Sequence, residues 1–145
     1  MLSVDTNLLV YAANPESPDH LAALGFVQEI PNSQHQYATC ELVLVELYMQ
    51  LRNKSTFSKP LTPAEASAYC QTLRNQPDWR HIDYDPAVSP KLWKWAAKTK
   101  GGLREIIDAR LALTLRHHGV THFATANVKH FQHFGFTQVW NPLLP

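Results

Sequence analysis

The sequence predicts an α/β fold in which a mainly parallel sheet is covered by helices on both faces. Short apolar strand patterns alternate with helical patterns along the chain. The first strand, Leu2–Val4, is apolar enough to be central in a sheet. A chain of 145 residues with 45% hydrophobic and 17% charged residues can bury a full core, so we expect a single domain over residues 1–145.

Helices are expected where an apolar periodic pattern has a start or a stop signal. Pro31 ends the first of them, and Thr62, Pro63 and Glu65 form a capping box at the start of the third. Gly119 suits the C-terminal cap of the last. The expected helices are Asp19–Glu29, Glu41–Arg52, Thr62 to about Asn75, Ser89 to about Thr99, and Leu103 to about His118.

Two of these helices carry expectations about burial. The helix from Glu41 to Arg52 has so few polar residues that it should be mostly buried. In the last helix, an apolar stripe recurs every four residues and should face the core; it consists of Ile107, Leu111 and Leu115.

Further strands are expected between these helices, at Gln36–Thr39, Arg80–Tyr84, Val120–Thr125 and Gln138–Trp140. In the second of them, Ile82 should point inward. Because ligands bind at the carboxyl ends of parallel strands, polar residues that directly follow a strand are candidates for a functional site.

Charge and cysteine content restrict the classes of partner. The net charge of +1 excludes polyanion binding by bulk charge, so any nucleic-acid contact needs a local patch. Cys40 and Cys70 match no metal or redox motif, which favours a reduced, cytoplasmic protein. The chain shows no export signal and no apolar run of about 20 residues, so no membrane partner is expected.

Three acids and one amide occupy positions where chemistry is expected. Asp5 directly follows the first strand, and Asn127 follows the strand that ends at Thr125. Glu46 lies in an almost wholly apolar helix, and Asp108 lies near the start of the last one. Each has an ordinary alternative: a helix cap or turn for Asp5 and Asn127, a surface ion pair for Glu46, and the helix dipole for Asp108. Together they form the hard oxygen-ligand set that Mg²⁺ and Mn²⁺ favour.

Four segments, in order, resemble the motifs of the PIN-domain family. They are Val4–Tyr11, Glu41–Leu47 with Glu46 in the place of the acid, Ile106–Ala112, and Phe123–Phe131, and Val139–Pro142 resembles the usual tail. The resemblance covers essentially the whole chain, and its length suits the VapC-like toxins of bacterial toxin–antitoxin pairs. It implies a PIN-like three-layer α/β/α sandwich with about five strands, magnesium-dependent endoribonuclease activity, homodimers and a small antitoxin partner.

The resemblance assigns roles to residues of this chain. Asp5 and Asp108 would bind Mg²⁺, or Mn²⁺ in its place, and Glu46 would ligate it or hold a coordinated water. Thr6, Thr125 and Asn127 would orient these groups. Many relatives have an aspartate where this chain has Asn127 or His130, so one firmly held metal ion is expected, and a second is left open. Either contacts to RNA phosphates or ordinary solvated surface charges are expected for Arg52, Lys54, Lys98, Lys100 and Arg104. Trp93 and Trp95 could stack on bases or pack in a core or dimer.

Two other functions compete with this hypothesis. A catalytically silent PIN-like module would bind RNA or a partner without cutting, and the amide of Asn127 favours it. A phosphatase with an aspartyl nucleophile would need a second acid two residues after Asp5, where this chain has Asn7. The chain also lacks a glycine-rich phosphate loop of the GxxxxGK type.

Overall fold

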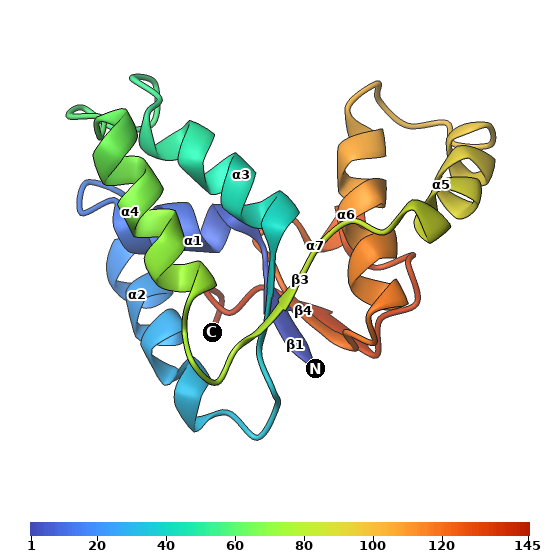
Figure 1. Ribbon diagram of the computed structural model, residues 1–145, viewed down its shortest axis with the longest axis horizontal. Coiled ribbons are helices and arrows are strands. Elements are labelled where there is room, and N and C mark those ends of the chain that lie inside the picture. Colours follow the sequence, from blue (N-terminus) through green and yellow to red (C-terminus); the bar gives the residue numbers. More distant parts are fainter.

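A computed structural model describes all residues, 1–145, and contains five parallel strands (Figure 1). They are β1 (Leu2–Val4), β2 (Ala38–Cys40), β3 (Arg80–Ile82), β4 (His122–Ala124) and β5 (Gln138–Trp140). One ladder has the order β1-β4-β5 and the other pairs β2 with β3, while a parallel bridge between Leu2 and Tyr37 connects the two. The overall order is β3-β2-β1-β4-β5, so the apolar β1 is central, as expected.

Helices cover both faces of the strands. They are α1 (Thr6–Ala13), α2 (His20–Glu29), α3 (Glu41–Leu51), α4 (Pro63–Arg74), α5 (Ser89–Ala96), α6 (Glu105–His117) and α7 (Val128–Phe131), with 3-10 turns at Ile30–Asn32 and Pro86–Val88. Figure 1 shows α1 to α4 on one side of the strands and α5 and α6 on the other. The expected three-layer α/β/α arrangement is confirmed.

Several local signals act as the sequence predicts. Thr62 and Glu65 form the reciprocal capping box at the start of α4. Gly119 follows α6 with φ of 86°, a backbone conformation that favours glycine. Ile82 is buried in β3, and Leu111 and Leu115 face the core from α6.

The burial expected for two helices is wrong in part. In α3, Val45 is 54% exposed and Met49 is 63% exposed, because the buried residues of this helix occupy its opposite side. Ile107 is 43% exposed, although it continues the stripe of Leu111 and Leu115. It lies in the first turn of α6, which extends beyond the strands (Figure 1).

The helix α1 was not among the expected elements. Four of its eight residues are buried aliphatic side chains, namely Leu8, Leu9, Val10 and Ala12. Their near-continuous run lacks the spacing of an amphipathic surface helix, so no helical stripe marked the segment. The helix begins directly after β1 because Asp5 caps it.

Cys40 and Cys70 are both buried free thiols. None of the helices combines the length and apolar character that crossing a membrane requires.

Candidate active site

The parallel pairing of β1 with β4 brings Asp5 and Thr125 together. Val4 is in register with Ala124, so the residues that follow them meet at the same edge of the sheet. The Thr125 hydroxyl donates a hydrogen bond of 2.6 Å to Oδ2 of Asp5. Both side chains are buried, with Asp5 only 6% exposed.

Both oxygens of the Asp5 carboxylate are held in place. Oδ1 accepts the backbone N–H of Thr6 at 2.8 Å, which is the N-cap bond of α1. Oδ2 accepts the Thr125 hydroxyl and, at 3.1 Å, the side-chain amide of Asn7. Asp5 is therefore also a helix cap, which was the alternative interpretation of this residue. The same carboxylate caps α1 and lies at the ligand-binding edge.

Asn7 is a part of the site to which the sequence reasoning gave no role. Its side-chain oxygen accepts the backbone N–H of Ala126 at 3.3 Å, while its amide nitrogen contacts Asp5 and lies 3.5 Å from Thr125. It thus connects the first turn of α1 to the end of β4. The available signal was its position two residues after a strand-end acid, where an amide can turn back toward that acid.

Glu46 points from α3 toward the same edge. It is half-buried, and its Oε2 accepts the Thr6 hydroxyl at 3.0 Å. The expected alternative, an ion pair with Arg52 or Lys54, is absent, and Arg52 contacts the ring and hydroxyl of Tyr48 instead. Thr6 therefore contacts both acids, Asp5 through its backbone N–H and Glu46 through its hydroxyl.

Asp108, in the first turn of α6, approaches the edge from the other layer. It is half-buried, and its Oδ2 lies 3.0 Å from Nδ1 of His130 on α7. From the sequence, His130 was only a departure from the family pattern. Asn127 is exposed, and its backbone N–H donates to the Thr125 hydroxyl at 2.9 Å.

In addition to burial, the charges of Glu46 and Asp108 both raise the pKa of Asp5, which places the three acids in one electrostatic neighbourhood. Burial raises the pKa of Asp5 to about 6; the bonds from Thr125 and Thr6 oppose this rise, and the charges of Glu46 and Asp108 add to it. Burial also raises the pKa of Glu46, with a further contribution from Asp108. Arg110, another residue that sequence reasoning did not select, lowers the pKa of Glu46.

The chemistry of these side chains fits a hard divalent cation. Carboxylates are the oxygen ligands that such ions prefer, and a cation would relieve the repulsion among the three acids. No three His, Cys, Asp or Glu side chains lie close enough together to hold one ion between them. Ligation of one ion by all three acids would therefore need a change in these side-chain positions, or a water between one acid and the ion.

The cations expected to contact RNA lie in two separate places. Arg52 ends α3 and Lys54 follows it. Lys98, Lys100 and Arg104 lie in the segment that joins α5 to α6. All five side chains are exposed, and none forms an ion pair.

Comparison with known proteins agrees with this architecture. The PIN domain family model matches residues 2–136. Ribonuclease VapC24 of Mycobacterium tuberculosis is 46% identical over 143 residues, which cover 99% of this chain and 97% of the relative.

Two solved structures share the fold. VapC20 of Mycobacterium tuberculosis, described as a Sarcin-Ricin loop cleaving toxin, has a TM-score of 0.69 at 17% identity, covering 94% of this chain and 96% of its own. FitAcB of Neisseria gonorrhoeae has a TM-score of 0.66 at 17% identity and covers 98% of both chains. From the family match and the near full-length relative, we conclude that the chain belongs to the PIN-domain family, among its VapC-type ribonucleases.

Proposed function

We propose that this protein is a magnesium-dependent endoribonuclease and the toxin of a toxin–antitoxin pair. One observation carries the proposal. Asp5, Glu46 and Asp108 reach one edge of the sheet from three different elements, and the pKa of Asp5 responds to the charges of the other two. Membership of the VapC-type ribonucleases supports RNA as the substrate and an antitoxin as the protein partner. A homodimer and a cytoplasmic location complete the proposal.

PIN-domain ribonucleases depend in general on divalent metal ions. In this chain Asp5 and Asp108 would hold Mg²⁺, for which Mn²⁺ could substitute, and Glu46 would ligate it directly or through a water. Asn127 offers a neutral amide, so one firmly held ion is proposed. A bound ion supplies Lewis-acid polarisation of the scissile phosphate and lowers the pKa of water.

The protein's own side chains would prepare this chemistry in advance. Thr125 and Asn7 fix Oδ2 of Asp5, so that the carboxylate is oriented before an ion arrives. Thr6 holds one oxygen of Glu46 and leaves the other free to orient an attacking water and to accept its proton. Asn127 would position the substrate or a water from the adjacent loop. The exposed cations proposed to contact RNA phosphates are Arg52, Lys54, Lys98, Lys100 and Arg104.

The test is cleavage of transfer RNA and other structured RNA by the purified protein without antitoxin. We expect cleavage in Mg²⁺ or Mn²⁺, none in EDTA, and arrest of growth when the protein is expressed alone. RNA that stays intact across titrations of both ions, with RNA binding retained, would show instead the catalytically silent module.

A further inference from the structure

The positive charge of this protein is concentrated in one segment. Residues 86–104 contain five cations and no acid, whereas the rest of the chain contains eight cations and twelve acids. A molecule with a net charge of +1 therefore carries a strongly cationic region on an otherwise acidic chain. Local concentration of this kind attracts polyanions even where the total charge does not.

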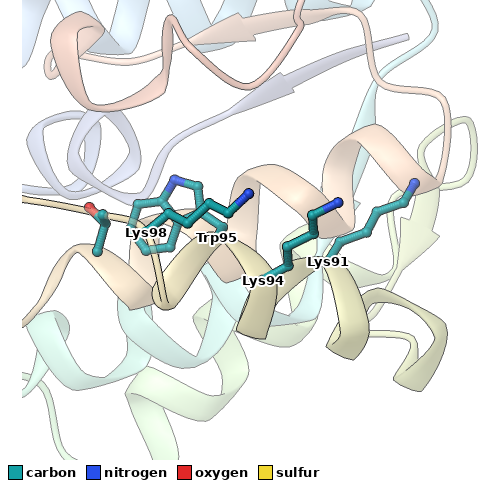
Figure 2. A pocket seen from close by; sticks show the side chains of 5 residues that line it. Lys91, Lys94, Trp95 and Lys98 are labelled. Atoms are coloured by element: carbon teal, nitrogen blue, oxygen red, sulfur yellow. The ribbon is translucent and has the colours of Figure 1, made fainter.

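Three of these cations form a row along α5 and the turn directly after it, which we call the lysine face. Lys91 and Lys94 lie on α5 and Lys98 in the turn after it; their spacings of three and four residues place them on the same side. Figure 2 shows their amino groups side by side, with the ring of Trp95 behind Lys98. Together with Thr99 these residues line a pocket of about 340 Å³.

The lysine face is left without partners inside the molecule. Its three side chains are exposed, and the four ion pairs of the structure involve only Arg74, His81, His117 and His130 as cations. Like charges three or four residues apart destabilise a helix slightly. An external anion could therefore bind these amino groups without breaking an ion pair within the protein.

Trp95 makes a nucleic acid a better match than an acidic peptide. Its ring is half-buried and packs against Phe134 with a centroid distance of 5.9 Å, so its orientation is fixed while one part stays in the pocket. An indole beside cations offers a stacking surface for a base or sugar as well as contacts to phosphate. From Lys91 to Lys98 the row spans about 10 Å at the rise of a helix, a length over which a double helix presents several phosphates.

We propose that the lysine face binds the phosphate backbone of RNA at a second site, apart from the acids, and so favours long or folded RNA that reaches both. The inference rests on the proposed ribonuclease function. The fold supports it, because α5 packs against α6 and the segment between them leads into the first turn of α6, which carries Asp108. A short oligonucleotide could occupy only the acid-lined site.

Binding of labelled transfer RNA, measured by fluorescence anisotropy in EDTA, tests the proposal. The double variant Lys91→Gln/Lys94→Gln removes two charges from the lysine face, and Lys59→Gln/Arg80→Gln removes two exposed charges elsewhere. We expect the first to weaken binding about 10- to 30-fold at 0.1 M salt and to reduce the slope of log K against log salt by about 1.4 to 1.8. The second should keep affinity within a few-fold of the wild type.

Equal loss in both double variants, or loss in neither, would overturn the proposal. So would a lysine face that binds a poly-glutamate peptide but contributes nothing to transfer RNA binding, which would assign it to an acidic protein partner. Cleavage separates this inference from the ribonuclease function. A wild type that binds RNA through the lysine face but never cleaves it would refute the ribonuclease function alone. A cleaving wild type whose affinity and preference for long over short RNA survive in Lys91→Gln/Lys94→Gln would refute the lysine face alone.

Discussion

Charged side chains are arranged differently in two regions of the molecule. One is the acidic edge, formed by Asp5, Glu46 and Asp108, and the other is the lysine face. Asp5 is 6% exposed and accepts three hydrogen bonds that fix its direction. The lysines are exposed and have no partner in the molecule. A buried charge destabilises the folded state, but its hydrogen bonds fix the position of the side chain. A surface charge costs little stability and attracts an oppositely charged ligand without fixing its position. We therefore assign cleavage of the phosphodiester bond to the acidic edge and affinity for RNA to the lysine face.

The sharpest way to separate the two regions is Asp5→Asn. We expect cleavage to fall at least about 10³-fold, equivalent to about 4 kcal/mol in the barrier, because a proposed metal ligand loses its charge. Binding of transfer RNA in EDTA should stay within a few-fold, since the lysine face is unchanged. Asp78→Asn, at an exposed acid, is the matched control for both assays. Equal growth of strains expressing wild type and Asp5→Asn, with both proteins soluble, would contradict the toxin function.

The acidic edge should make stability depend on pH in the absence of metal. The folded protein holds the Asp5 proton up to a pKa of about 6, against an ordinary value of 3.8. The unfolded chain thus loses this proton first, and the contribution of Asp5 to stability, full below pH 4, is lost as pH rises through 6. The expected loss is about 3 kcal/mol.

Urea unfolding in EDTA from pH 3.5 to 7.5 measures this loss as the difference between wild type and Asp5→Asn. The subtraction removes the opposite contributions of Glu65 and Asp85, whose pKa values are lowered by hydrogen bonds. Saturating Mg²⁺ should offset the loss at neutral pH, because an ion that binds only the folded state stabilises it. Parallel curves for the two proteins would show that Asp5 is not the responsible group.

Thr125→Val tests whether orientation of Asp5 matters apart from its charge. The Thr125 hydroxyl lowers the pKa of Asp5, so its loss should raise that pKa further and let protons compete better with the ion. We expect the Mg²⁺ concentration for half-maximal cleavage to rise about tenfold at pH 6 and less at pH 8. Thr114→Val is the control: Thr114 is equally buried, but its hydroxyl bonds only to the Arg110 carbonyl within α6. The same shift in both variants would indicate a general packing defect.

The smallest effect is expected for Asn127→Asp, which tests how the number of carboxylates at the acidic edge affects the number of bound ions. A fourth carboxylate beside Thr125 should increase affinity for a second Mn²⁺, with a change of less than about tenfold because the side chain is exposed. Isothermal titration calorimetry of wild type and variant counts the bound ions. Two tightly bound ions in the wild type already would contradict the single-ion proposal.

The sequence predicted most of the fold because its signals were local. The capping box at Thr62 and Glu65 and the apolar β1 need no knowledge of distant residues. The exposure of Val45 and Met49 was not predictable, because it depends on where the neighbouring helices stop covering α3. The helix α1 was missed because a helix surrounded by other elements has no polar face to reveal its period.

The acidic edge was predictable as a set of residues but not as a geometry. Asp5, Glu46 and Asp108 were selected from strand ends and an out-of-place acid, and their roles as metal ligands remain predictions. The contacts of Asn7 with Thr125 and Ala126, and of His130 with Asp108, join segments whose proximity only the register of β1 and β4 and the packing of α7 determine. Neither residue type at such a position signals a partner about 20 or more residues away.

The double role of Asp5 would also affect how such an enzyme can lose activity by mutation. Because its carboxylate caps α1 as well as facing the proposed ion, most replacements of Asp5 would weaken the start of a buried helix along with the chemistry. Changes at the half-buried Glu46 or Asp108 would carry no such folding defect. In a population selected against ribonuclease activity, inactivating substitutions should therefore accumulate at those two positions before they appear at Asp5.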